Sequence, residues 1–135
     1  MSASGGTAAP GEAVDIDEAN AWSEVVEPTA ALLFRFSAVT FNSHRIHYDH
    51  SYATSVEHYP GLVVQGPLTA MLLAMSASRR LQRPLASFTF RASAPLFVDQ
   101  PIHISGTITD TGPNTQAQMT ATRRDGVTAM ASTAR

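Results

Sequence analysis

Histidines cluster in one stretch of this sequence. Four of the five lie within fifteen residues, at His44, His47, His50 and His58. An imidazole titrates close enough to neutrality to take a proton in one step and return it in the next. The same stretch ends in Gly66-Pro67, which opens an apolar segment. Backbone N–H groups at the start of a buried helix can stabilise a developing oxyanion. The pattern therefore favours proton transfer beside a carbonyl group.

The segment that must present Gly66 is predicted to be a central helix. Residues 67–79 (PLTAMLLAMSASR) are apolar almost all round, which predicts a helix buried on nearly every side. Pro67 suits its first turn, where a missing N–H costs nothing. Its C-terminus is closed by basic residues that complement the helix dipole, namely Arg79, Arg80 and Arg83.

A second predicted helix directly precedes the histidine-rich stretch. Apolar residues recur at three- and four-residue spacing over 30–39, with Thr29 as the N-cap. A possible short strand over 22–27 precedes it. Between residues 42 and 59 we expect an ordered loop with a short helix at about 50–55, capped by Asp49. Arg45 is expected to pair with an acid such as Asp49 or Glu57.

The remainder of the chain is predicted to be strands. Alternating patterns cover 85–98, 102–108, 116–123 and 127–134, with hairpin-type turns at 110–114 and 124–126. A buried helix followed by an antiparallel meander of four strands predicts an α+β fold. A curved sheet wrapped around such a helix is the single hotdog arrangement. We place this domain at 18–135, after a flexible N-terminal segment at 1–17.

Composition excludes several classes of chemistry and partner. Cysteine is absent, which removes disulfides, thiolate metal sites and cysteine nucleophiles, and all nine basic residues are arginine, which removes Schiff-base chemistry. The net charge of −2 argues against a nucleic-acid partner. Residues 35–135 nevertheless carry nine arginines against five acids, which would attract an anionic small molecule. With no apolar run of about 20 residues and no signal-peptide pattern, we expect no membrane association and a cytoplasmic location.

Two runs of the sequence carry a family resemblance. Residues 36–53 and 60–68 resemble the MaoC-like (R)-specific enoyl-thioester hydratases and 3-hydroxyacyl-thioester dehydratases. The run Thr40-Phe41-Asn42-x-His44-Arg45-Ile46-His47-Tyr48-Asp49 resembles in particular the branch with mesaconyl-C4-CoA hydratases and mitochondrial-type 3-hydroxyacyl-thioester dehydratases. The likeness covers about residues 28–134.

The resemblance implies catalytic residues, with one departure from the wider family. That family's motif is Asp-x-Asn-Pro-(Leu/Ile/Val)-His, whose histidine falls on His47 and whose aliphatic residue falls on Ile46. Arg45 replaces the proline, His44 the asparagine and Asn42 the catalytic aspartate. Asparagine can orient a water but cannot take its proton. His47 is then the principal base, unless His44 or another acid shares the work.

The implied reaction is hydration of an acyl thioester, or its reversal. Water would be held between Asn42 and His47, while the thioester carbonyl accepts a hydrogen bond from the Gly66 N–H. Assisting roles fall on His44, Arg45 and Asp49, and substrate contacts on the residues around Gly66, namely Val64, Gln65 and Pro67. Phosphate groups of coenzyme A would find candidate partners in Arg79, Arg80, Arg83 and Arg91.

Each of these residues also has a purely structural interpretation. Asp49 can be only a helix cap, His50 and His58 can be surface residues, and Gly66 can be required only by a turn. A metal site formed by His44, His47, Asp49 and His50 is disfavoured, because the spacing matches no helical zinc pattern and hydration needs no metal. We expect no cofactor.

Alternatives to a hydratase remain open at this stage. A hotdog thioesterase would normally place an acid near the central helix, and residues 67–83 contain none. An accessory subunit of a larger hydratase assembly is a further alternative. The expected substrate is an acyl-CoA or a carrier-protein-bound acyl thioester. We expect a homodimer, because an antiparallel sheet with exposed edges favours pairing with a second copy.

Overall fold

The computed structural model describes residues 20–110 and 115–135. The predicted flexible segment 1–17 and residues 111–114 of a predicted turn lie outside them. The elements, in chain order, are β1 (Ala21–Val26), α1 (Ala30–Thr40), the 3₁₀ turn η2 (Arg45–His47), the π-helical turn η3 (Tyr52–Val56), α2 (Gly66–Leu81), β2 (Phe88–Ala92), β3 (Ile102–Asp110), β4 (Gln116–Arg123) and β5 (Thr128–Ala134).

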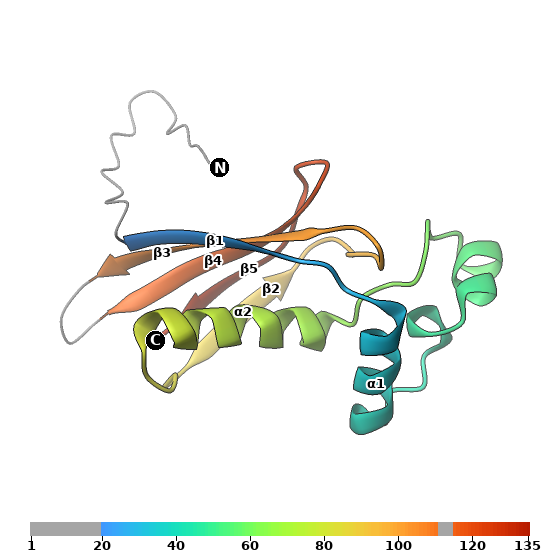
Figure 1. Ribbon diagram of the computed structural model, residues 1–135, viewed down its shortest axis with the longest axis horizontal. Helices are drawn as coiled ribbons and strands as arrows, with labels where there is room; N and C mark the ends of the chain where they lie inside the picture. Colours follow the sequence, from blue (N-terminus) through green and yellow to red (C-terminus); the bar gives the residue numbers. More distant parts are fainter. Residues whose placement is uncertain (1–19, 111–114) are drawn as a thin grey trace.

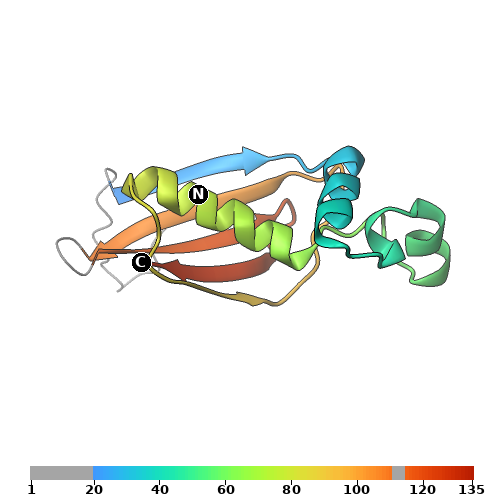
Figure 2. The same ribbon diagram turned by 90° about the horizontal axis from the view of Figure 1, so that it is seen from below.

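The strands form one antiparallel sheet, and α2 lies across one of its faces (Figures 1 and 2). The strand order is β1-β3-β4-β5-β2. Both predicted helices are present, and the predicted α+β sheet wrapped on a central helix is confirmed. No helix within the described ranges combines the length and the apolar character that crossing a bilayer requires.

The prediction of a four-strand meander is wrong. Only β3, β4 and β5 pair in sequence, whereas β2 pairs with β5 and β3 pairs with β1. The segment after β2 leaves the sheet: Val98 N–H donates to Leu62 O at 3.0 Å, and Val64 N–H donates to Leu96 O at 2.8 Å. The predicted strand 85–98 therefore ends at Ala92, and Pro95 lies in the part that crosses the end of the sheet.

The central helix is buried on one face and exposed on another. Its buried residues are Leu68, Thr69, Ala70, Leu73, Ser76 and Ala77. Met71 and Met75, by contrast, are 48% and 49% exposed. The prediction of burial on nearly every side is therefore wrong for the single chain, because the sheet covers only one side of α2.

Helix α1 and the histidine segment project beyond the sheet, at the end where α2 begins (Figures 1 and 2). Thr29 caps α1 as predicted, its Oγ1 accepting from Leu32 N–H at 3.1 Å. The helix ends at Thr40 and is capped by Phe41, whose φ of 54° is left-handed; Asn42 N–H then donates to Ser37 O at 2.9 Å. This cap sets where Asn42 leaves the helix.

A polar cluster fixes the C-terminal half of α2 to β1. Trp22 Nε1–H donates to Ser76 Oγ at 3.0 Å, and the Ser76 hydroxyl donates in turn to Glu24. Glu24 also pairs with Arg79 at 3.1 Å. The Trp22 ring lies directly over Gly106, its partner on β3. The aromatic ring therefore occupies the space that a side chain at position 106 would need.

We predict that Gly106→Ala destabilises the fold by about 1–3 kcal/mol, because overpacking forces the surroundings to move. A Cβ at Gly106 would lie 2.6 Å from a Trp22 ring carbon. Gly61→Ala is the matched control, since a Cβ there meets nothing within 4 Å. Urea unfolding of both variants measures the difference. Equal stability of the two would contradict the packing of Trp22 on Gly106.

Candidate active site

The extended segment 62–64 connects the histidine turn to the start of α2. Val63 N–H donates to Ile46 O at 2.9 Å, and Val63 O contacts His47 Nδ1 at 2.6 Å. On its other side this segment pairs with residues 96–98, through a bridge between Val63 and Phe97. Gly66 follows three residues after Val63. His47 and the first turn of α2 are therefore held in one hydrogen-bonded unit.

His47 is buried and hydrogen-bonded in a way that favours a neutral imidazole. Its side chain is buried, and because the Val63 carbonyl can only accept, Nδ1 carries the hydrogen and Nε2 keeps its lone pair. Burial lowers the pKa of His47 below its ordinary value of 6.5, although the hydrogen bond to Val63 partly opposes this. The neighbouring His44, 5.8 Å away between ring centroids, lowers it further. At pH 7 the imidazole is therefore ready to accept a proton.

Asn42 and His44 form the turn that precedes His47. Asn42 Oδ1 accepts from the His44 N–H at 3.1 Å, and the His44 ring accepts from the Ile46 N–H at 3.5 Å. His44 thereby caps η2 and is exposed. Since the oxygen of the Asn42 side chain is used within this turn, its NH₂ group is the end suited to hold a ligand or water.

Arg45 and Asp49 brace the loop. Arg45 Nη2 lies 2.9 Å from Asp49 Oδ2, and the guanidinium stacks 4.3 Å from the centroid of the Tyr52 ring. Asp49 Oδ1 accepts from Tyr52 N–H at 3.1 Å, so the predicted cap and the predicted ion pair are both confirmed. Arg45 holds the pKa of Asp49 below its usual range. Glu57, the other candidate partner of Arg45, instead accepts from the Tyr52 hydroxyl.

Gly66 is open on the side where a side chain would stand. It is the first residue of α2, its φ is not positive, and a Cβ there would meet nothing within 4 Å. The backbone conformation therefore does not require glycine. Open space in front of a helix N-terminus allows a ligand oxygen to approach its N–H groups.

The residues around Gly66 differ in what they can offer a substrate. Val64 and Gln65 are buried, and Gln65 Nε2 donates to Leu33 O at 2.8 Å and to Ser37 Oγ at 2.9 Å. Their side chains thus face the protein, which restricts any substrate contact to their backbone. Pro67 is exposed. The link from Gln65 to α1 was not predicted, because no local pattern signals contacts across about thirty residues.

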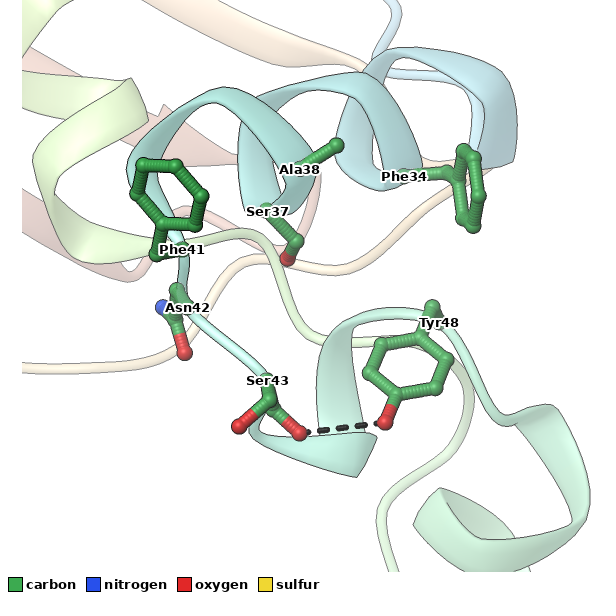
Figure 3. A pocket seen from close by; sticks show the side chains of 7 residues that line it. All are labelled: Phe34, Ser37, Ala38, Phe41, Asn42, Ser43 and Tyr48. Carbon is green, nitrogen blue, oxygen red and sulfur yellow. Dashed lines mark hydrogen bonds between the residues drawn. The ribbon is translucent and has the colours of Figure 1, made fainter.

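An apolar pocket of about 320 Å³ lies beside Asn42, between α1 and the loop (Figure 3). Phe41 is 94% exposed, and the Tyr48 hydroxyl donates to Ser43 O at 3.1 Å, which joins two of the lining residues. Its lining is Phe34, Ser37, Ala38, Phe41, Asn42, Ser43 and Tyr48. No charged side chain contributes to it. The pocket was not predicted from the sequence, because the apolar period of a helix does not distinguish aromatic residues that line a pocket from those that pack in the core.

Three of the four arginines proposed for coenzyme A have structural partners at the far end of α2, and the fourth, Arg91, lies on β2. Arg79 pairs with Glu24, Arg80 stacks 5.4 Å from the Trp22 ring centroid, and Arg83 donates to Thr115 O. Arg79 lies thirteen residues along the helix from Gly66, which is roughly 20 Å. Within residues 20–110 and 115–135, no group of three or more His, Cys, Asp or Glu is arranged to hold a metal ion.

A family model decides how this chain is classified. The model of hydroxyacyl-thioester dehydratase type 2 matches residues 4–98. The chain belongs to the hydroxyacyl-thioester dehydratase type 2 family. The predicted resemblance is thereby confirmed, and the match contains every residue to which we assigned a catalytic, assisting or substrate-binding role.

Similar proteins agree with this membership. The chain is 46% identical over 115 residues to a mesaconyl-C(4)-CoA hydratase of Chloroflexus aurantiacus, covering 84% of this chain and 39% of that protein. It is 43% identical over 93 residues to a mitochondrial hydroxyacyl-thioester dehydratase type 2 of Schizosaccharomyces pombe, covering 67% of this chain and 30% of that protein. The chain thus spans well under half the length of these relatives.

A solved structure confirms the fold. The (R)-hydratase of A. caviae involved in PHA biosynthesis superposes with a TM-score of 0.77 at 16% identity, covering 91% of this chain and 96% of that one. At this identity the likeness concerns the fold alone. The single hotdog fold predicted from the sequence is therefore present in this family member.

We predict that His47 titrates below pH 6.5, because burial disfavours its charged form. Since its folded pKa is lowered, its contribution to stability is complete above pH 6.5 and is lost as the pH falls through the folded value. Histidine-selective NMR titration measures the pKa, and urea unfolding of wild type and His47→Gln measures the pH dependence. A pKa at or above 6.5 would contradict the buried position of the ring.

Proposed function

We propose that this chain is a hydro-lyase that adds water to a 2-enoyl thioester or removes it from a 3-hydroxyacyl thioester. The observation that carries the proposal is the single unit formed by His47 and Gly66: a neutral imidazole with a free Nε2, hydrogen-bonded to the segment that leads into an open helix N-terminus. The two similar proteins described above are named as a hydratase and a dehydratase of such compounds.

The residues account for each proton and electron pair in hydration. His47 Nε2 takes a proton from water, and the hydroxide oxygen bonds to Cβ of the enoyl group. The electron pair of the Cα–Cβ double bond moves toward the carbonyl, whose developing oxyanion accepts a hydrogen bond from the Gly66 N–H. The imidazolium then returns the proton to Cα. Dehydration is the reverse sequence.

Asn42 is proposed to orient the water. Its Oδ1 already accepts from the His44 N–H, so its NH₂ group donates to the water oxygen while His47 accepts the water proton. This division of work explains how the site functions with an amide where the wider family has a carboxylate. Arg45 and Asp49 assist by holding the turn, through their ion pair and the hydrogen bond that Asp49 accepts from the Tyr52 N–H.

A thioesterase is less well supported. Helix α2 contains no acidic residue to serve as base or nucleophile. The loop acids Asp49 and Glu57 accept hydrogen bonds from Arg45 and Tyr52.

The proposed substrate is an acyl-CoA or a carrier-bound acyl thioester, and its acyl group is not specified. The cytoplasmic location stays a prediction.

The proposed partner is a second copy of the chain, paired along the outer edge of β2. In the strand order β2 has a neighbour on only one side, and Phe90 on it is 49% exposed. Met71 and Met75 add exposed apolar surface on α2. Edge pairing would remove the open strand. The greater length of the similar proteins is also consistent with a larger assembly.

We predict that Gly66→Ala lowers the hydration rate, by up to the roughly 10²–10³ that losing one oxyanion donor costs, because its methyl group would occupy the open space through which the thioester oxygen is proposed to approach the Gly66 N–H. The fold should be retained, since a Cβ there meets nothing within 4 Å and alanine favours helix. Gly61→Ala is the control for the neighbouring loop. Full activity of Gly66→Ala would contradict the proposed approach of the thioester oxygen through the space beside Gly66.

His47→Ala should abolish hydration, with a loss of at least about 10²-fold, because the base is removed. The assay follows enoyl-thioester absorbance with crotonyl-CoA, mesaconyl-CoA and a longer enoyl-CoA, beside a reagent for free thiol. Loss of absorbance without thiol release supports hydration. Thiol release would indicate a thioesterase, and no reaction with any of these substrates in the wild type would contradict the proposal for acyl-CoA.

Phe90→Lys on the β2 edge should convert a dimer into a monomer of about 14.4 kDa, because it places a charge in the proposed interface. Val25→Lys is the matched control on the opposite edge strand, where Val25 is also exposed. Light scattering coupled to size exclusion gives both masses. Dissociation by Val25→Lys alone would assign the interface to β1 instead.

A further inference from the structure

We infer that Gln65 is a positioning residue that sets the distance between the two halves of the active site. This inference rests on the proposed function. One half is Asn42 and His47 on the projecting segment, and the other is the N-terminus of α2. Gln65 immediately precedes Gly66, and its side chain reaches α1.

The contacts of Gln65 form a short path to Asn42. Gln65 Nε2 donates to Ser37 Oγ at 2.9 Å and to Leu33 O at 2.8 Å. Ser37 O accepts from the Asn42 N–H at 2.9 Å. Gln65 thus directly precedes Gly66, the proposed oxyanion donor. Through Ser37 it is also connected to Asn42, the residue proposed to hold the water. Helix α1 cannot shift along α2 without breaking these bonds.

Two observations indicate that the amide is more than a packing group. Gln65 is 0% exposed, and its Oε1 has no hydrogen-bond partner among the described residues. A buried polar atom without a partner is costly, and an apolar side chain of similar size would avoid that cost. The two hydrogen bonds that Nε2 donates are therefore what the amide contributes at this buried position.

Gln65 also leaves the oxyanion position accessible. It stands at the N-cap of α2, yet its side chain makes no capping hydrogen bond to that helix. A serine or aspartate there would normally accept from the first-turn N–H groups. By turning toward α1, Gln65 joins the two halves of the site without competing for the N–H groups that face the substrate.

The test is Gln65→Met, which keeps the length of the side chain and removes its hydrogen bonds. We expect kcat to fall about 10- to 100-fold with KM changed less than about threefold, since small misplacement of reacting groups costs rate more than binding. If Gln65 acts through Asn42, adding Gln65→Met to Asn42→Ala should cause no further loss of kcat. A full additional loss in the double variant would overturn the inference.

Ser76→Ala serves as the control for stability. It removes a hydrogen bond from the other end of α2, so it should lower the melting temperature while leaving kcat within about twofold. Equal kcat for Ser76→Ala and Gln65→Met at equal melting temperature would also overturn the inference. If Gln65→Met does not fold, Ser37→Ala replaces it, because it removes one of the two acceptors, and the same outcomes apply.

A second readout separates this inference from the proposed function. Backbone amide shifts of Asn42 and Gly66 should both move in Gln65→Met and stay unchanged in Ser76→Ala. This holds whether or not the wild type hydrates any thioester tested. An inactive wild type with these shifts would contradict the proposed function alone, and unchanged shifts at Asn42 would contradict the role of Gln65.

Discussion

The hydrogen bond between the Val63 carbonyl and His47 Nδ1 is the interaction on which the site depends. It fixes which ring nitrogen carries the hydrogen, and it ties the projecting turn to the segment that leads into α2. That segment is itself held against residues 96–98 at the end of the sheet. The orientation of the proposed base is therefore determined by the core of the fold and not by the loop alone.

The candidate site combines a buried, neutral imidazole, that of His47, with the accessible N-terminus of α2. Burial keeps His47 uncharged, which suits a base, while the uncapped N-terminus of α2 offers positive potential where negative charge would develop. No carboxylate contacts His47 within the described residues, so its pKa is not raised by an acidic neighbour. The amide at position 42 is consistent with this balance, because it adds no charge beside His47.

Local elements were predictable because they depend on short-range patterns. The apolar period predicted α1, and the apolar segment 67–79 that starts with Pro67 predicted α2. Thr29 and Asp49 were recognisable as caps, and alternation located β3 and β4. The strand order was not predictable, because the departure of the chain after β2 depends on pairing between 96–98 and 62–64. Likewise, the burial of α2 within the single chain was overestimated. An apolar composition does not tell whether a given face of a helix packs against the sheet or against a partner subunit.

The candidate residues came from the sequence, but their contacts did not. The family motif led to His47 and Asn42, and the start of the apolar helix led to Gly66; their catalytic roles stay predictions. The Val63 carbonyl that contacts His47 is sixteen residues away in sequence. The contacts of Gln65 with α1 span 28 and 32 residues. Such links arise only when α1 packs against the start of α2. The partner of a buried polar side chain is therefore the part of this site that required the structure.

The most direct test of the account is NMR of ¹⁵N-labelled protein with butyryl-CoA, a saturated thioester that cannot be hydrated. The account predicts that the Gly66 amide and the His47 Nε2 resonance shift together, with the same saturation curve, and that coenzyme A lacking an acyl group does not reproduce the Gly66 shift. Shifts at only one of the two groups, or at neither while butyryl-CoA binds elsewhere, would contradict a shared site.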